Sequence, residues 1–323
     1  MTLGKQRFQS KYMTIQHFAV EKHWNICWMC RNLGISKAAY YKWLKREVSV
    51  AEQENVLIAQ LIEEYDERFN HILGYRRMTL WINHLNNKRY SVNRIHRIMK
   101  KFGIKSVIRK KKTKYFNVKP ETVAENVLKR DFNASRPNEK WVTDVTEFKW
   151  YEVGEKRKLY LSAILDLYDR SIVAYEVSKR NDNNLTLSTF EKAIVSNPEA
   201  KPIFHSDRGF NYTSKMFQDG LVTNKIVPSM SRVGRCIDNC PMEGFWGIVK
   251  SEMYYINKFE NEEQLRKAID DYIYFYNNER LQCRFKGLTP SQVRQEALKT
   301  NEPKAYPIAE NKRIKKFKEK FAA

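Results

Sequence analysis

Apolar residues in the first third of the chain recur at helical spacing. Within residues 15–44, the stretch LGISKAAYYKWLKR contains a glycine that ends one helix and Ser36, which can cap the next. The stretch LGYRRMTLWINHLNNKRYSVNRIHRIMKKFGI predicts two more helices separated by a turn. Residues 51–68 are strongly helical with one apolar stripe, which indicates a packing helix. The pattern therefore predicts two helix-turn-helix units, at residues 1–50 and 51–115.

From residue 140 the hydrophobic period changes from that of helices to that of strands. Three segments joined by short turns predict an antiparallel meander, at residues 141–149, 158–167 and 171–177. Helices and strands then alternate, with helices near 184–196, 213–220 and 261–277 and strands at 202–206 and 226–230. This order predicts an α/β core with a mixed five-stranded sheet and covering helices.

The core is placed at residues 139–256. Residues 116–138 lack a clear period and are interpreted as the linker that leads into it. Residues 257–323 are interpreted as a C-terminal helical segment that ends in a basic tail.

The composition fits a globular protein that acts on a polyanion. The chain has 323 residues, 42% of them hydrophobic, and a net charge of +22. Residues 1–140 hold 29 of the 59 lysines and arginines but 12 of the 37 acidic residues. The front of the chain is therefore the better candidate for a phosphate-binding surface.

The sequence also favours a cytoplasmic protein with reduced thiols and no membrane partner. No apolar run approaches the 18 residues that a membrane-spanning helix needs, and there is no signal-peptide pattern. Five cysteines in a chain of this size do not make a disulfide framework.

Cys27 and Cys30 could together suggest a zinc site with His17 and His23. The spacing is not the usual one for zinc. We therefore favour the interpretation that both cysteines are core positions of a helix.

Three acidic residues form a candidate metal site. Asp144 lies inside WVTDVTEF, which has the period of a strand, although aspartate is disfavoured within strands. Asp207 follows a short buried strand in IFHSDRGF, and Gly209 permits the turn after it. Glu243 lies on the helix predicted for DNCPMEGFWGIVKSE, with Lys250 seven residues further on the same face. Carboxylates from strands and a facing helix can hold a hard cation such as Mg²⁺.

These motifs, in this order, resemble the second-reading-frame (orfB) transposases of a large bacterial insertion-sequence family. The resemblance also rests on YNNERLQCRFKGLTPSQ and on the two upstream helical stretches, and it runs from about Ile15 to about Ala297. All three acids fit the family pattern. The chain departs from that pattern at Cys236, Cys240, Gly244, Leu281 and Gln282.

The resemblance implies a ribonuclease H-like catalytic core like that of retroviral integrases, with a DDE triad of Asp144, Asp207 and Glu243. The triad would bind two Mg²⁺ or Mn²⁺ ions about 3.5–4 Å apart. Asp144 is expected to bridge the ions, with Asp207 and Glu243 each holding one, and Lys250 to hold a DNA phosphate. The implied reaction exposes 3′ ends and joins them to DNA by direct transesterification.

The resemblance also implies the partners. They are DNA, both the terminal inverted repeats and a target, further copies of the chain in a dimer or larger assembly, and the first-frame product of the same element. The implied location is the bacterial nucleoid. The residues expected to contact DNA, besides Lys250, are Arg76, Arg77, Arg94, Arg97, Lys100, Lys101, Arg109, Lys110, Lys111 and Lys112.

Neighbouring polar residues compete for roles in the site. Asp238 is the main rival for the third position, but its place before Asn239 favours a helix cap. Asp166, at the end of an apolar strand, is interpreted as a structural hydrogen-bond partner. His205 and Arg208 flank Asp207, and we expect them to orient it or the DNA.

Two other functions compete with transposition. A ribonuclease H-like nuclease would share the acids but stop at hydrolysis, and it would not need two N-terminal binding units. A catalytically silent DNA-binding regulator would be expected to have lost at least one acid, and all three are present.

Overall fold

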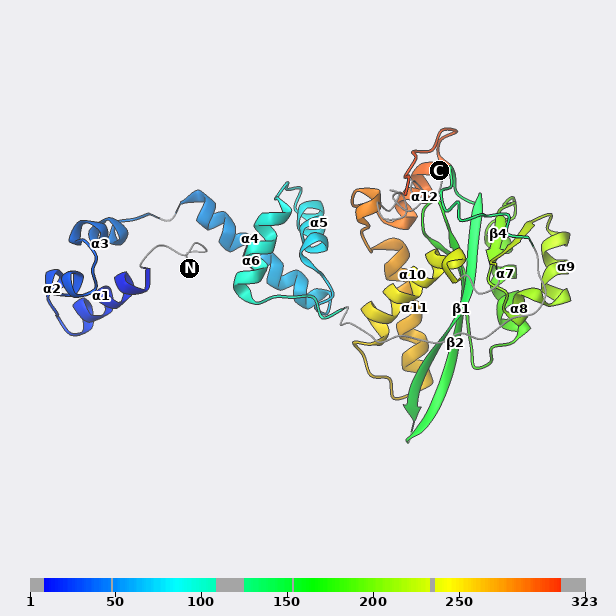
Figure 1. Ribbon diagram of the computed structural model, residues 1–323, viewed down its shortest axis with the longest axis horizontal. Helices are drawn as coiled ribbons and strands as arrows, with labels where there is room; N and C mark the ends of the chain where they lie inside the picture. Colours follow the sequence, from blue (N-terminus) through cyan, green and yellow to red (C-terminus); the bar gives the residue numbers. More distant parts are fainter. Residues whose placement is uncertain (1–8, 48, 109–124, 153, 233–235, 309–323) are drawn as a thin grey trace, which may run out of the picture. The chain divides into compact units, whose positions relative to one another are not determined.

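The computed structural model describes residues 9–47, 49–108, 125–152, 154–232 and 236–308 of the chain. The chain divides into two compact units, Met1–Ser106 and Val107–Ala323 (Figure 1). In the described residues no helix is both long and apolar enough to cross a membrane.

The first unit begins with three short helices around a small aromatic core. The predicted turn is confirmed, since Gly34 adopts a φ of +65° and the Ser36 side chain accepts a hydrogen bond from the Ala39 amide. The helix predicted ahead of this turn is in fact two helices. Ile15 and Tyr40 are buried between the elements, which are α1 (Gln9–Glu21), α2 (Ile26–Asn32) and α3 (Lys37–Leu44).

The next three helices match the predicted boundaries closely. Ser49 and Glu52 form a capping box at the start of the packing helix, and Gly103 ends the last helix with a φ of +72°. Phe102, the last residue of its helix, is 40% exposed. The elements are α4 (Val50–Arg68), α5 (Tyr75–Leu85) and α6 (Val92–Phe102).

The second unit is built on a five-stranded sheet in the order β3-β2-β1-β4-β5. The predicted meander is confirmed, since β1–β2 and β2–β3 are antiparallel, whereas β1–β4 and β4–β5 are parallel. This is the ribonuclease H-like arrangement expected from the sequence. The strands are β1 (Lys140–Glu152), β2 (Glu155–Asp166), β3 (Ile172–Ser178), β4 (Ile203–Ser206) and β5 (Val227–Met230).

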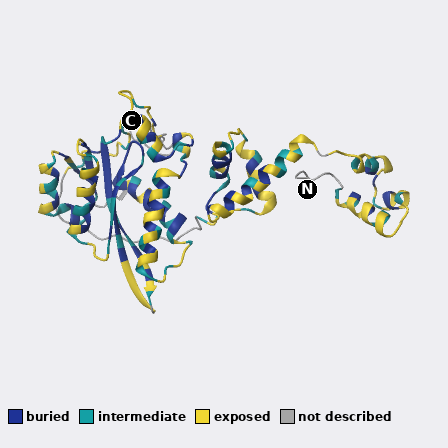
Figure 2. Ribbon diagram, turned by 180° about the vertical axis from the view of Figure 1, so that it is seen from behind, coloured by how far each residue is buried: buried dark blue, intermediate teal, exposed yellow. Residues whose placement is uncertain are grey.

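Helices cover both faces of this sheet (Figure 1). On one face, Trp141 and Phe204 pack with aromatic residues of α7 (Asn183–Ser196), α8 (Phe210–Thr213) and α9 (Lys215–Thr223). On the other face, Val142 and Leu161 pack with α10 (Cys240–Val249) and α11 (Glu262–Asn278). Figure 2 shows that the sheet is buried along most of its length and exposed at the tip of the β1–β2 hairpin.

Two buried ion-pair clusters fasten the C-terminal helices to this core. A π-helical turn, Lys250–Tyr254, follows α10, and its Glu252 accepts two hydrogen bonds from Arg280, 2.8 and 2.9 Å long. Arg294 of α12 (Pro290–Leu298) reaches Asp166 at 3.1 Å and Asp169 at 3.0 Å.

Candidate active site

The parallel register of β1 and β4 brings two of the three acids together. Val142 lies opposite His205 in this pair of strands. Asp144 and Asp207 each come two residues later, so the same register continued places them side by side. The strand period also turns Asp144 toward the face that carries Val142 and is covered by α10.

Backbone and side-chain donors fix the two carboxylates. The Oδ1 atom of Asp144 accepts a 2.8 Å hydrogen bond from the amide of Val145, and Oδ2 accepts a 3.0 Å bond from the indole of Trp246. Oδ1 of Asp207 accepts a 2.8 Å bond from the amide of Gly209. A Cβ atom at position 209 would lie 3.0 Å from that same oxygen, so glycine permits this close approach.

The two aspartates share an environment that penalises negative charge. Burial and the charge of Asp207 raise the pKa of Asp144 from 3.8 to about 7, and the charge of Glu243 adds to this effect. Burial also raises the pKa of Asp207. A bound cation would reverse this penalty, because an opposite charge stabilises the ionised carboxylate.

Helix α10 carries the third acid and is docked on β1 at two places. The amide Nδ2 of Asn239 donates to the carbonyl oxygen of Thr143 at 2.9 Å, and Trp246 donates to Asp144. Glu243 lies between these contacts, in the first turn of α10, and its side chain is exposed.

The expectation that Asp238 caps α10 is wrong, whereas Asn239 stands at the N-cap position but makes no side-chain capping bond. Asn239 uses its side chain for the contact with Thr143. Asp238 is buried and pairs with Arg130 at 2.6 Å and Arg232 at 2.9 Å, contacts that hold its pKa well below the usual range. Asp238 is therefore a tertiary ion-pair residue.

The carboxylate oxygens of the three acids suit a hard divalent cation, because Mg²⁺ and Mn²⁺ prefer oxygen ligands. Asp144 and Asp207 offer adjacent carboxylates, and Glu243 lies on the neighbouring helix. In the described part of the chain, no three His, Cys, Asp or Glu side chains are grouped closely enough to hold a metal ion as they stand. Completing the set requires the exposed Glu243 side chain to turn toward the aspartates.

Lys250 lies at the C-terminal end of α10, seven residues after Glu243. Its ammonium group is 5.6 Å from the centre of the Phe148 ring on β1. This contact holds the cation on the face of the sheet that also carries Asp144.

Other residues named from the sequence have structural partners. His205 is fully buried between the hydroxyls of Ser229 and Ser231, and burial lowers its pKa to about 4. Arg208 donates to the carbonyl oxygen of Ser231. His205 thus joins β4 to β5, and Arg208, just after β4, contacts the residue just after β5. The expectation that they orient Asp207 or the DNA stays a prediction.

Asp166 has the structural role that the sequence indicated. It is fully buried, accepts from the amides of Asn138 and Tyr168, and pairs with Arg294.

The prediction for the two N-terminal cysteines is half right. Cys30 is buried in the core of the first helices, whereas Cys27, in the first turn of the short α2, is exposed.

The predicted DNA-contacting residues of the first unit differ in exposure. Arg76, Arg97, Lys100 and Lys101 are exposed, and Arg77 is half-buried. Arg94 was expected to point outward, but it packs against α4, where it pairs with Glu54 at 2.6 Å and donates to Asn55 at 2.8 Å. Residues Arg109, Lys110, Lys111 and Lys112 lie outside the described residues.

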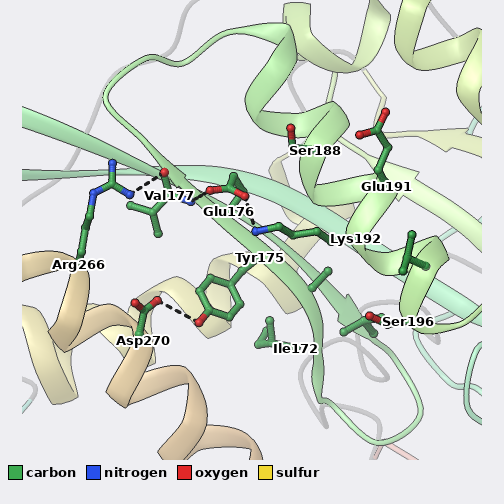
Figure 3. A pocket seen from close by; sticks show the side chains of 13 residues that line it. Ile172, Tyr175, Glu176, Val177, Ser188, Glu191, Lys192, Ser196, Arg266 and Asp270 are labelled. Atoms are coloured by element: carbon green, nitrogen blue, oxygen red, sulfur yellow. Dashed lines mark hydrogen bonds and ion pairs between the residues drawn. The ribbon is translucent and has the colours of Figure 1, made fainter.

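A separate groove of about 800 Å³ runs along the edge strand β3, between α7 and α11 (Figure 3). Its polar side chains bind one another, as Tyr175 does with Asp270 at 3.0 Å and Lys192 with Glu176. None of the three acids lines it. The groove is therefore a feature distinct from the candidate active site.

Comparisons with known proteins bear on the family of this chain. Two models described as integrase core domain match residues 134–236 and 243–298, and one described as HTH-like domain matches residues 52–112. The chain is 36% identical over 267 residues to the putative transposase InsK for insertion sequence element IS150 of Escherichia coli, which covers 82% of this chain and 92% of that protein. The chain belongs to the orfB-type transposases of bacterial insertion sequences.

More distant relatives extend the likeness over most of the transposase. Transposase InsF for insertion sequence IS3A, also of Escherichia coli, is 27% identical over 86% of this chain and 98% of its own length. Among solved structures, the HTLV-2 integrase catalytic core domain in complex with magnesium is 24% identical with a TM-score of 0.38, covering 49% of this chain and 96% of that one. The match to InsK confirms the family assignment made from the sequence motifs.

Sequence reasoning assigned no role to Trp246 and did not find the contact that Asn239 makes with β1. Both lie in the quoted motif DNCPMEGFWGIVKSE, but their partners are in β1, about a hundred residues earlier. An aromatic residue three positions after the helix acid was the available signal, since i and i+3 share a helix face.

Proposed function

We propose that this transposase binds the ends of its element, cleaves to expose 3′ ends and joins them to DNA by metal-dependent transesterification. The proposal is carried by the parallel register of β1 and β4, which would bring Asp144 beside Asp207, and by the contact of Asp144 with the helix that bears Glu243. Such a set of acids, in an integrase core, is what two-metal phosphodiester chemistry requires.

The residues that would hold the metal ions are Asp144, Asp207 and Glu243. When bound, Mg²⁺ or Mn²⁺ would activate the attacking oxygen and stabilise the leaving 3′ oxygen. Asp144 is the central ligand, because it lies beside Asp207 on one side and beneath α10 on the other. Asp207 is oriented by the Gly209 amide. Glu243, on a docked helix, would contribute an exposed carboxylate.

Lys250 would supply positive charge on the face of the sheet that carries Asp144. Because its ammonium group lies over Phe148 of β1, it would bind a DNA phosphate beside the end of α10. No side chain of the protein needs to act as a covalent nucleophile in this reaction.

The helical units of the first half would bind the terminal inverted repeats. Support comes from the HTH-like match at residues 52–112 and from the exposed basic side chains of α5 and α6. Arg76, Arg97 and Lys100 are suited to phosphate contacts, which position a protein on the duplex. Residues 1–50 would also bind the terminal inverted repeats. The other partners would be target DNA, further copies of the chain and the first-frame product.

A strand-transfer assay tests the proposal. A labelled terminal-repeat duplex is incubated with the full chain, Mg²⁺ or Mn²⁺ and a plasmid target. Joined products are expected, and Asp144→Asn or Glu243→Gln should abolish them while end binding is retained. Asp219→Asn is the matched control, because Asp219 is an exposed acid on α9 outside the site.

Other outcomes would point to the competing functions. Cleavage without joining by the wild-type chain would favour a nuclease. Tight end binding without any chemistry would favour a regulator. Equal loss of binding and chemistry in Glu243→Gln would contradict its role as a metal ligand.

A further inference from the structure

We propose that Trp246 is a positioning residue that holds the carboxylate of Asp144 ready to bridge two cations. Its indole Nε1–H donates to Oδ2 of Asp144 at 3.0 Å, from α10 across to β1. Such a bond to an ionised carboxylate is stronger than one between neutral groups. The inference rests on the proposed function, since it assigns Asp144 to the reaction.

The donor is rigidly held. Trp246 is 6% exposed and belongs to the core cluster between α10 and the sheet. Its ring packs against Phe245, with centroids 5.1 Å apart. The start of α10 is fixed by the bond from Asn239 to the carbonyl oxygen of Thr143, the residue before Asp144. The indole therefore approaches Asp144 from a helix that is anchored at the adjacent residue.

The carboxylate of Asp144 keeps acceptor sites that its two hydrogen bonds do not use. An ionised carboxylate offers about four acceptor sites, two on each oxygen. The amide of Val145 occupies one site on Oδ1, and Trp246 occupies one site on Oδ2. Within the residues that the structure describes, one acceptor site therefore remains on each oxygen, and the two hydrogen bonds oppose rotation of the carboxylate. A carboxylate that bridges two cations needs one such acceptor site on each of its oxygens.

The same contact also sets the position of the third acid. Trp246 follows Glu243 by three residues, so the two side chains leave the same region of the helix surface. Loss of the indole bond would therefore loosen the side chain of Asp144 and also the position of Glu243 relative to it.

The chain contains a matched control for packing. Trp150 is 5% exposed and belongs to the same core cluster as Trp246. In the described part of the chain its Nε1–H has no hydrogen-bond partner. Trp150→Phe therefore removes the same atoms from the same core without removing a bond to Asp144.

The experiment compares Trp246→Phe with Trp150→Phe in the full chain. Binding of Mn²⁺ alone is measured by electron paramagnetic resonance, alongside strand transfer, terminal-repeat binding and the thermal midpoint. Loss of a group that orients a metal ligand typically costs about 10–100-fold in metal affinity or activity. We expect Trp246→Phe to weaken Mn²⁺ binding and slow joining in that range, with end binding retained. Trp150→Phe should leave both within about twofold of wild type.

The proposal is overturned if Trp246→Phe binds Mn²⁺ as tightly as Trp150→Phe, or if the two lose affinity equally. If Trp246→Phe does not fold, replacement of Trp246 by benzothienylalanine keeps the ring shape without the N–H and gives the same comparison. Failure of the proposed function is distinguishable. In that case the wild-type chain does not join DNA ends, whereas the Mn²⁺ affinities of the variants still decide the role of Trp246.

Discussion

Removing one partner of the buried pair of Glu252 and Arg280 should be among the most destabilising single substitutions in the second unit. Their side chains are 2% and 10% exposed, and the guanidinium reaches both carboxylate oxygens at 2.8 and 2.9 Å. The Tyr272 hydroxyl donates to the same carboxylate at 2.9 Å. The pair therefore joins the π-helical turn after α10 to the end of α11.

Arg280→Met would keep most of the apolar stem and remove the charge that neutralises Glu252. Breaking a buried ion pair by removing one partner costs about 3–5 kcal/mol, because the other charge remains in the interior. We expect a loss of this size in the free energy of unfolding of the second unit, measured by urea titration. The double variant Arg280→Met, Glu252→Leu should recover most of it, since replacing both charges with apolar groups is often near neutral.

Arg157→Met is the control for this experiment. Arg157 pairs with Glu155 at 2.8 Å, but the two side chains are 53% and 69% exposed. Exposed pairs contribute about 0–1 kcal/mol. If Arg280→Met costs no more than Arg157→Met, the reasoning about burial is refuted.

Three further predictions follow from single contacts. Gly209→Ala should slow strand transfer about tenfold or more while the thermal midpoint changes little, because the new Cβ would crowd Oδ1 of Asp207 at 3.0 Å and turn a metal-binding carboxylate. Burial opposes ionisation of Glu147, but Lys149 and Lys158 outweigh it and lower its pKa from 4.5 to about 2. Its stabilising effect is present above pH 4.5 and lost as the pH falls toward 2. Glu147→Gln should therefore make the thermal midpoint less dependent on pH between 4.5 and 2, and a pH dependence equal to that of the wild type would contradict this. Alanine at Arg97 and Lys100 should each lower the salt dependence of end binding by about one unit of the log–log slope, and an equal slope would remove that residue from the phosphate contacts.

The sequence predicted what depends on periodicity and on local caps. The alternation around Asp144 predicted both its strand and its unusual placement, and Gly34 and Ser36 marked helix ends correctly. The family motifs then led to the right fold, because the order of strands and helices is carried by the order of the segments.

Long-range partners explain most of the errors. Asp238 has the local setting of a cap, but Arg130 pairs with it from more than a hundred residues earlier. Arg94 follows the polar face of its helix and is nevertheless covered by Glu54 and Asn55 of α4. In the sequence Trp246 has the pattern of an ordinary core aromatic. Only the docking of α10 on β1 shows that its N–H donates to Asp144.

The register of β1 restricts where the length of this protein can vary in evolution. Side chains alternate between the two faces of a strand, so inserting one residue between Lys140 and Asp144 would turn the aspartate toward the core of Trp141 and Phe204. The same insertion at the β1–β2 hairpin would leave that register intact. Natural relatives should therefore differ in hairpin length, while the first five residues of β1 neither gain nor lose a position.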